Sequence, residues 1–307
     1  MMKKIGRWLM LAVMFCVVCA FQADHVTTIF IIGDSTAAQK DLSTGSPERG
    51  WGMALQCYFD STFVRVDNHA VNGRSSKSFI NEKRWDKVLS LLKPGDYVII
   101  QFGHNDEKPK ADRHTDPGST FDYNLAKFVR ETREKGGIPI LMNAVVRRNW
   151  LPADQAQTAK PVGQKIDDEN LRNTVATGKV TSAAKAKRKK KETAVELPNV
   201  LADTHGLYIV APRDVAQRMN VHFVDANRST HLLEDSLGEE GSKKLHMIYA
   251  PGEHPAIPQG RQDNTHYNIY GAHMVAQRLA DALCKEIPLL SRYRTSGDVC
   301  NLEKTKH

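Results

Sequence analysis

Residues 27–36 read Thr-Thr-Ile-Phe-Ile-Ile-Gly-Asp-Ser-Thr, a short apolar run followed at once by Gly33, Asp34 and Ser35. A continuous run of β-branched and aromatic residues that ends in a turn signal is typical of a strand buried on both faces. Such strands belong to parallel sheets that are covered by helices. The sequence therefore predicts an α/β fold in which Ser35 emerges at the carboxyl end of the first strand, where open α/β sheets place their sites.

Similar apolar runs recur along the chain, each bounded by Gly, Asp, Asn or Pro. Together with the first run they give five predicted strands, at residues 27–32, 64–71, 97–102, 138–146 and 221–224. Segments with the apolar spacing of helices lie at residues 51–59, 79–92, 121–134, 210–219 and 270–287. Because strands and helices alternate, we expect a central five-stranded parallel sheet with helices on both faces, closed by the last helix.

The first 20 residues have the pattern of a secretory signal peptide. Three cations precede the apolar run 8–18, and Val18-Cys19-Ala20 is a small-residue cleavage pattern after it. The alternatives are a lipidated Cys19 or a membrane anchor, although the run is shorter than the roughly 20 residues that a span needs. We expect an exported protein, periplasmic or extracellular, without stable membrane insertion after signal removal. Its single domain would cover residues 21–290, followed by a tail at 291–307.

Residues 151–201 depart from the alternating pattern because they are rich in Ala, Lys, Gln and Thr and have few large apolar side chains. Such a segment buries too little surface to offset its ordering entropy, so we predict a poorly structured insertion, with a short solvated helix at 183–194. Seven Lys and Arg and no acid lie within 179–191. Removing these and the three cations of the leader changes the formal charge from +8 to −2. The basicity is local and does not indicate a nucleic-acid partner, although a polyanion or envelope anchor is an alternative.

Three cysteines follow the predicted leader: Cys57, Cys284 and Cys300. An odd number leaves at least one free thiol in an exported chain. Either Cys284 and Cys300 are bridged around the C-terminal tail, or Cys284 is buried on the last helix. No cysteine pair has zinc-ligand spacing and the His-Glu-x-x-His motif is absent, so the sequence indicates no metal site.

Polar residues also follow the second and third predicted strands, in Asn72-Gly73-Arg74-Ser75 and Gly103-His104-Asn105-Asp106. The carboxyl ends of parallel strands meet at one edge of a sheet, so Gly73 and Asn105 should lie near Ser35. A glycine permits close backbone approach to a ligand, and an asparagine side chain offers an amide donor. With the backbone N–H of Ser35 they would form a three-donor oxyanion hole.

The segment Asp263-Asn264-Thr265-His266 comes just before the last predicted helix. An Asp three residues ahead of a His can fold back within one turn to accept the Nδ1–H of the imidazole. The Nε2 atom is then free to take a proton from a serine hydroxyl, which is a poor nucleophile without such a base. The sequence therefore predicts Ser35, His266 and Asp263 as a catalytic set.

These blocks resemble the GDSL/SGNH hydrolase family, in order along the chain: Gly33-Asp34-Ser35, Gly73, Gly103-x-Asn105-Asp106 and Asp263-x-x-His266. The flanking residues, including Thr36 and Asn72-Gly73-Arg74-Ser75-Ser76, are similar to the rhamnogalacturonan acetylesterase branch. The resemblance covers about residues 27–150 and 205–285. The insertion at 151–201 and the long stretch 228–262 depart from the family pattern, and either could reshape the substrate groove.

The resemblance implies a flavodoxin-like three-layer SGNH fold, with Ser35 as nucleophile, His266 as base and Asp263 as its orienting partner. It also implies removal of O-acetyl groups from pectic polysaccharide, without a metal or organic cofactor. The partner would be an acetylated plant cell-wall polysaccharide or oligosaccharide, and we expect a monomer. Additional substrate-binding candidates at the same strand ends are Asp34, Thr36, Arg74 and His104.

Several alternatives remain within this interpretation. The cations Arg74 and Lys77 suit an anionic glycan, but they could equally be solvated surface charges. No long apolar lid lies near the blocks, which argues against a lipase. The same fold also hosts acetylxylan esterases, other short-chain acyl esterases and lysophospholipase-type enzymes, and a glycan-binding module that has lost its chemistry is a further alternative.

Overall fold

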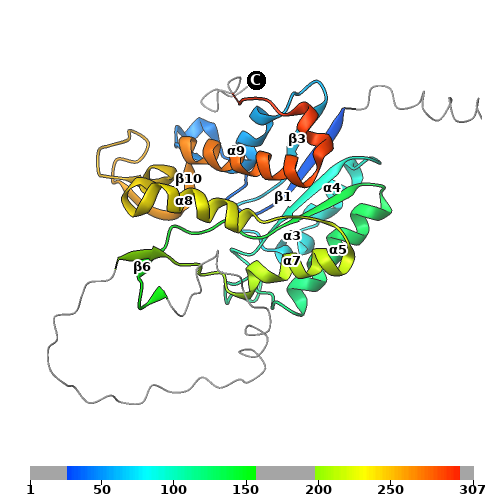
Figure 1. Ribbon diagram of the computed structural model, residues 1–307, viewed down its shortest axis with the longest axis horizontal. Helices are drawn as coiled ribbons and strands as arrows, with labels where there is room; N and C mark the ends of the chain where they lie inside the picture. Colours follow the sequence, from blue (N-terminus) through cyan, green and yellow to red (C-terminus); the bar gives the residue numbers. More distant parts are fainter. Residues whose placement is uncertain (1–25, 157–197, 298–307) are drawn as a thin grey trace, which may run out of the picture.

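The computed structural model describes residues 26–156 and 198–297 of the chain (Figure 1). Its central sheet has the strand order β3-β1-β4-β5-β8, and every neighbouring pair is parallel. The strands are β1 (Thr27–Gly33), β3 (Val64–Asn68), β4 (Tyr97–Gln101), β5 (Ile138–Met142) and β8 (His222–Val224). The predicted five-stranded parallel sheet is confirmed, although β3 and β5 end several residues before their predicted ends.

Strand β1 lies inside the sheet, between β3 and β4, and its apolar side chains divide between two cores. Ile29 and Ile31 point to one face, whereas Phe30 and Ile32 point to the other. All four are at most 1% exposed. Because successive side chains of a strand point to opposite faces, an unbroken apolar run is the pattern that a strand covered on both sides requires.

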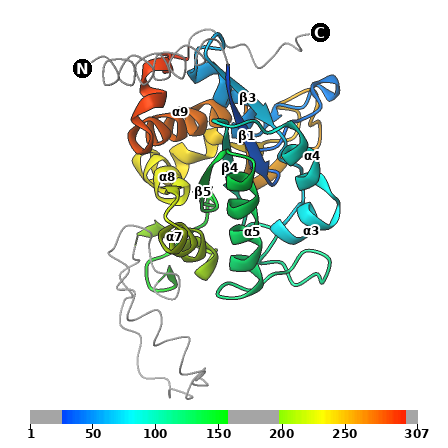
Figure 2. The ribbon, with the colours of Figure 1, turned by 90° about the vertical axis from the view of Figure 1, so that its right-hand side faces the viewer.

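Helices cover both faces of the sheet, as Figures 1 and 2 show. One core joins the sheet to α2 (Trp51–Ala54), η2 (Leu55–Tyr58), α8 (Ala226–Ser242) and α9 (Ile269–Glu286). The other core joins it to α3 (Ser76–Asn81), α4 (Arg84–Leu91), α5 (Thr120–Glu134) and α7 (Leu207–Met219). The predicted three-layer α/β architecture is therefore confirmed, and α9 closes the domain as expected.

Two of the predicted helices are interrupted. The segment 79–92 forms α3 and α4 rather than one helix, because Lys83 adopts a left-handed conformation with φ of 58°. Ser75 caps α3 through a capping box with Ser78. The helix therefore begins at Ser76, three residues before its predicted start. In the segment 51–59, the last turn tightens into the 3-10 helix η2.

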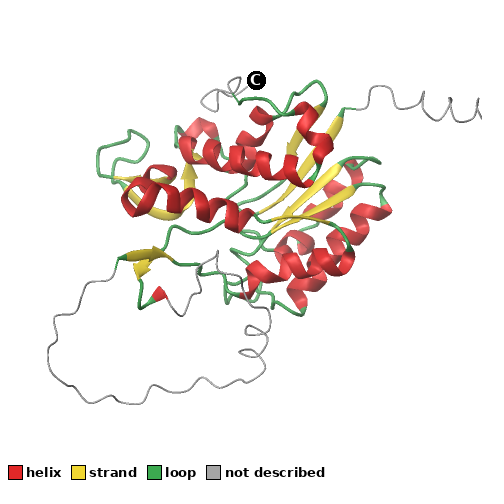
Figure 3. Ribbon diagram, viewed as in Figure 1, coloured by secondary structure: helices red, strands yellow, loops and turns green. Residues whose placement is uncertain are grey.

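The stretch 228–262, which the sequence left without a predicted structure, holds most of α8 and a hairpin. The short helix η4 (Lys243–Leu245) leads into β9 (His246–Tyr249), which pairs antiparallel with β10 (Arg261–Asn268). The two-residue strand β2 (Glu48–Arg49) pairs with the other edge of β10. This three-stranded sheet, in the order β2-β10-β9, carries the segment Asp263–His266. Figure 3 shows the strands of the central sheet in yellow between the helices in red.

The 3-10 helices η1 (Leu42–Thr44) and η5 (Pro288–Tyr293) complete the described elements, together with a small strand pair. That pair, β6 (Trp150–Pro152) and β7 (Asn199–Leu201), joins the two ends of the predicted insertion antiparallel. The predicted signal peptide, the predicted helix at 183–194 and the basic block 179–191 lie outside the described residues. No helix within the described ranges has the length and apolar character to cross a membrane.

The state of Cys284 decides between the two alternatives that the sequence left open for the cysteines. Cys284, partly buried on α9, is free, so a bridge between Cys284 and Cys300 is wrong. Cys57 is disulfide-bonded instead. The side chain of Cys284 packs at the edge of the core beneath α9, where burial raises the pKa of its thiol.

Candidate active site

Ser35 lies directly beyond β1, at the carboxyl edge of the sheet. Gly33 lets the end of β1 lie close to β4, since a Cβ at Gly33 would lie 2.7 Å from the carbonyl oxygen of Gln101. The N–H groups of Ala37 and Ala38 both donate to the carbonyl of Asp34, at 3.2 and 3.0 Å. This turn leaves Ser35 partly exposed while its neighbours on both sides are buried.

The structure brings together the three side chains that the sequence predicted as a catalytic set. Nε2 of His266 lies 2.9 Å from Oγ of Ser35. Nδ1 of the same imidazole lies 2.8 Å from Oδ2 of Asp263. A carboxylate at Nδ1 fixes that nitrogen as the donor, so Nε2 is left as the acceptor for the serine hydroxyl. The arrangement can therefore remove the Ser35 proton as the oxygen attacks a carbonyl.

Asp263 and His266 lie in β10, whereas the sequence predicted a turn before the last helix. The pairing of β10 with β9 is irregular between Asp263 and Tyr267, and this bulge lets the strand fold back locally. Oδ1 of Asp263 accepts the backbone N–H groups of Thr265 and His266, at 2.9 and 3.0 Å. The expected local fold-back is thus present, but it is built into a paired strand that fixes it in place.

Asp263 is ionised throughout the ordinary pH range. Burial alone would raise the pKa of its carboxyl group, but hydrogen bonds from the side chain and backbone of His266 and from Thr265 outweigh burial. Together they hold the pKa of Asp263 well below its usual range. A carboxylate that stays charged also stabilises the imidazolium that forms when His266 takes a proton.

The predicted oxyanion donors lie at the ends of β1, β3 and β4. Gly73 has a φ of +74°, a left-handed conformation that favours glycine. The backbone N–H groups of Ser35 and Gly73 donate to no acceptor among the described residues. The Asn105 side chain donates one N–H to the carbonyl of Arg74 at 3.1 Å, which leaves its second N–H for a ligand. These donors can stabilise the negative charge on an oxygen bound beside Ser35.

The structure places Asp34, Thr36 and His104 beneath this surface rather than on it. They are 0%, 1% and 3% exposed, respectively. Asp34 accepts from the backbone N–H and hydroxyl of Thr36, at 2.9 and 2.8 Å, and its other oxygen lies 3.3 Å from Nδ1 of His104. Their contacts support the turn that carries Ser35, and a contact of these three side chains with substrate stays a prediction.

The buried Asp34 and His104 side chains also have shifted pKa values. Burial raises the pKa of Asp34, but His104 and the hydrogen bonds from Thr36 outweigh it and lower the pKa to about 2. Burial lowers the pKa of His104 to about 4, even though Asp34 opposes the change. At neutral pH this pair is therefore a carboxylate beside a neutral imidazole.

The side chains of Arg74 and Lys77 both form hydrogen bonds with other groups of the protein. Arg74 pairs with Glu82 at 3.0 Å and donates to the carbonyl of Asn72 at 2.9 Å. Nζ of Lys77 donates to the carbonyl of Ala111 at 2.7 Å. Arg74 also adjoins the oxyanion donors through its main chain, because its backbone carbonyl accepts from Asn105.

Three charged residues that no sequence motif marks join the two ends of the site. Arg261 donates to Oδ2 of Asp263 at 2.6 Å and to Glu48 at 2.7 Å. Glu48 in turn pairs with Lys40 at 2.7 Å, and Lys40 donates to the carbonyl of Ser35 at 2.8 Å. With Ser35, His266 and Asp263 they form a closed ring of polar contacts. The one local signal was the alternation of Arg261 with Asp263 in β10.

The buried carboxylate of Asp106 holds the segment Gly103–Asp106, which follows β4. It accepts from the backbone N–H and hydroxyl of Ser76, at 3.1 and 2.5 Å, and from the hydroxyl of Thr115 at 2.8 Å. Burial raises the pKa of Asp106 to about 6, although these hydrogen bonds oppose the change. Asp106 thus links the segments that carry Gly73 and Asn105.

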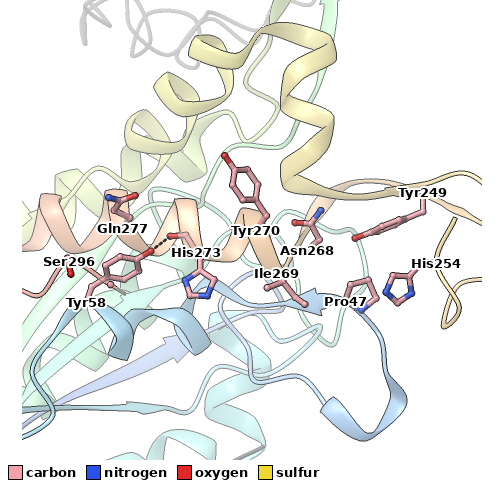
Figure 4. A pocket seen from close by; sticks show the side chains of 11 residues that line it. Pro47, Tyr58, Tyr249, His254, Asn268, Ile269, Tyr270, His273, Gln277 and Ser296 are labelled. Carbon is pink, nitrogen blue, oxygen red and sulfur yellow. Dashed lines mark hydrogen bonds between the residues drawn. The ribbon is translucent and has the colours of Figure 1, made fainter. Parts of the chain in front are cut away.

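A cavity of about 740 Å³ lies apart from these residues, along the start of α9 and beside the β9–β10 hairpin (Figure 4). Its lining is mainly aromatic and uncharged polar, and Tyr58 donates across it to the carbonyl of His273 at 3.0 Å. None of the predicted site residues lines it. Within the described ranges no group of three or more His, Cys, Asp or Glu side chains could hold a metal ion.

Comparisons with known proteins agree with this geometry. The family model of the GDSL-like lipases and acylhydrolases matches residues 31–268. The chain is 32% identical to the rhamnogalacturonan acetylesterase RhgT of Bacillus subtilis over 255 residues, which cover 83% of this chain and 88% of the relative. It is 28% identical to the probable rhamnogalacturonan acetylesterase YesY of the same organism, over 85% of this chain and 94% of the relative.

A solved structure extends the likeness to the fold. The crystal structure of the Bacillus subtilis protein YxiM superposes with a TM-score of 0.61 at 22% identity, covering 86% of this chain and 58% of that chain. The serine turn, the strand-end donors and the Asp-x-x-His segment all fall within the residues that the family model matches. The chain therefore belongs to the GDSL-like lipase/acylhydrolase family of carboxylic ester hydrolases.

Proposed function

We propose that the protein is an acetylesterase that removes O-acetyl groups from rhamnogalacturonan through a Ser-His-Asp acyl-enzyme mechanism. The observation that carries the mechanism is the unbroken contact path from Ser35 through His266 to Asp263, at 2.9 and 2.8 Å. The substrate class is supported by the two rhamnogalacturonan acetylesterase relatives, which align over more than four-fifths of this chain.

In the first half of the reaction, Oγ of Ser35 attacks the acetyl carbonyl while His266 takes the hydroxyl proton. The carbonyl oxygen becomes an oxyanion that accepts from the N–H groups of Ser35, Gly73 and Asn105, each contributing about 3 kcal/mol to the barrier reduction. The intermediate then collapses, and His266 returns its proton to the departing sugar oxygen. The products of this half are the free sugar hydroxyl and an acetyl ester on Ser35.

In the second half, His266 takes a proton from water as the water oxygen attacks the acetyl-enzyme. The same donors stabilise the second oxyanion, and the proton on His266 passes to Oγ of Ser35 as the C–O bond breaks. Acetate leaves and the serine hydroxyl is restored. Asp263 keeps its charge in both halves and holds the imidazole in the tautomer that the reaction needs.

The test is acetate release from acetylated rhamnogalacturonan, with acetylated xylan and the Ser35→Ala variant run alongside. We expect release from the pectic substrate that is lost in the variant. Equal or faster acetate release from xylan would agree with the Ser-His-Asp mechanism but contradict rhamnogalacturonan as the substrate. p-Nitrophenyl esters of increasing chain length add a second criterion, because a sharp loss of rate beyond acetate excludes the lipid-directed alternatives.

Export and a monomeric state are part of the same proposal. A pectic polysaccharide is met outside the cytoplasm, which suits the leader predicted at residues 1–20. The N-terminal sequence of the protein recovered from the periplasm and the medium tests export, and its mass in solution tests the monomer. A chain that retained its first 20 residues in the cell would overturn the export prediction.

A further inference from the structure

A surface loop beside the oxyanion donors is closed at its two ends. The loop comprises residues 106–115, and Thr115 N–H donates to the carbonyl of Asp106 at 3.1 Å. The Thr115 hydroxyl adds a bond of 2.8 Å to the Asp106 carboxylate, and Tyr208 donates to the Thr115 carbonyl at 2.5 Å. These bonds fix the two ends of the 106–115 loop, so its backbone starts and ends at a defined place beside Asn105.

One of these side chains reaches the oxyanion hole. Nζ of Lys108 donates to Oδ1 of Asn105 at 3.0 Å, on the same amide group that offers its N–H to the ester oxygen. Other cations near the site have acidic partners: Lys40 pairs with Glu48 and Arg113 with Asp112. Lys108 is exposed, and no carboxylate lies within ion-pair distance of it among the described residues.

The charge of Lys108 is not compensated by its surroundings. Burial of part of the side chain and the positive charges of Arg147 and Arg113 lower the pKa of Lys108, against the weaker effect of Asp34 and Glu107. Arg113 also extends over the other donor, since its Nη1 lies 3.9 Å from the point where a Cβ on Gly73 would be. Lys108 thus presents beside Asn105 a positive charge that has no ion-pair partner among the described residues, and a bound anion would supply one.

We propose that Lys108, assisted by Arg113, binds the carboxylate of a uronic acid unit next to the acetylated sugar. This proposal rests on the proposed function and names the substrate feature that the same site recognises. A charged ammonium group beside the oxyanion hole would hold an acidic glycan with the scissile ester over Ser35. A neutral glycan offers this cation only hydroxyl groups, which form weaker hydrogen bonds than a carboxylate does.

The test uses p-nitrophenyl acetate as the reporter substrate and unacetylated digalacturonate as a competing ligand. Lys108→Gln removes the charge but keeps a donor for Asn105, and Lys110→Gln removes a charge from an exposed position of the same loop as the matched control. Each enzyme's own uninhibited rate is the reference. We expect the inhibition constant to rise at least about tenfold in Lys108→Gln and to stay at the wild-type value in Lys110→Gln.

Inhibition by the neutral disaccharide galactobiose sets the background. The proposal is overturned if digalacturonate inhibits the wild type no better than galactobiose, or if Lys108→Gln and the wild type have the same inhibition constant. In 0.5 M salt, the inhibition constant of digalacturonate should rise for the wild type and stay unchanged for Lys108→Gln, because salt screens a contact between charges.

A second measurement separates this proposal from the proposed function. The ratio of kcat/KM for acetylated rhamnogalacturonan to kcat/KM for its carboxyl-reduced form should fall at least about tenfold in Lys108→Gln. An equal loss on both substrates would make Lys108 a positioning residue for Asn105 and overturn carboxylate recognition. If the wild type releases no acetate from either polymer but is still inhibited by digalacturonate through Lys108, the proposed function fails and the anion site stands.

Discussion

Arg261 and His266 contact the same carboxylate oxygen. The guanidinium group donates to Oδ2 of Asp263 at 2.6 Å, and Nδ1 of the imidazole lies 2.8 Å from that oxygen. The guanidinium group also pairs with Glu48 at 2.7 Å, so it links the Asp263 carboxylate to β2. Arg261 therefore helps to position the carboxylate that holds the imidazole.

Replacement of Arg261 by methionine tests this relationship. Without the guanidinium, Asp263 keeps its bonds to Thr265 and His266 but loses its link to Glu48. We expect kcat on p-nitrophenyl acetate to fall about tenfold in Arg261→Met with little change in KM, because the loss of positioning acts on the reacting groups. A merely structural role for Arg261 would lower the melting temperature and leave the kcat of the folded protein unchanged.

The matched control is Arg218→Met. Arg218 also loses a short ion pair, to Asp122 at 2.6 Å, but this pair lies on α7 and α5 and Arg218 is 58% exposed there. Its kcat should equal that of the wild type. Equal kcat values for all three proteins would show that Arg261 does not position Asp263.

The residues that the structure brings together as the sequence predicted are those whose placement depends on local order. Ser35, Gly73 and Asn105 each follow a strand of the parallel sheet, and all such strands end at one edge. Asp263 and His266 are three residues apart, so their contact needs only a local fold-back. In each case, chain neighbours and strand direction are enough to bring the functional groups together.

The residues that sequence reasoning missed depend on contacts between distant segments. Lys40 and Glu48 meet Arg261 only because β2 pairs with β10, and two-residue strands such as β2 carry no periodicity. His104 shows the opposite error, since a polar side chain at a strand end is expected to face solvent. Its burial follows from packing against His205, whose ring centroid lies 4.5 Å away, and no local pattern reveals that neighbour.

Ser35→Ala should abolish turnover without affecting the fold. The Ser35 hydroxyl contacts His266, and its removal leaves no cavity because the side chain is partly exposed. We expect kcat to fall at least about 10,000-fold, and His266→Ala to cause a comparable loss, because the two groups act as a unit. Acetate release measures the activity, and thermal unfolding checks the fold. A folded Ser35→Ala protein with near-wild-type rates would refute the mechanism.

Asn105→Ala removes one donor from the oxyanion hole and leaves the nucleophile in place. The loss of about 3 kcal/mol of transition-state stabilisation corresponds to a decrease in kcat of about 100- to 1,000-fold. KM should change little, because the donor acts mainly on the charge that develops in the transition state. A variant that raised KM and kept kcat would instead place Asn105 in ground-state binding. Steady-state kinetics on p-nitrophenyl acetate distinguish the two results.

Asp106 predicts how the stability of the protein changes with pH. Its pKa of about 6 in the folded protein lies above the ordinary value of 3.8, so the folded state holds a proton that the unfolded state has lost between these values. The contribution of Asp106 to stability is full below about pH 4 and is lost as pH rises through about 6, with a total of about 3 kcal/mol.

In Asp106→Asn, the amide keeps an acceptor for Ser76 and Thr115 but does not titrate. We therefore expect the free energy of unfolding of the wild type to fall relative to Asp106→Asn between pH 4 and 7, as measured by denaturant titration. A constant difference across that range would mean that hydrogen bonding keeps Asp106 ionised in the folded state.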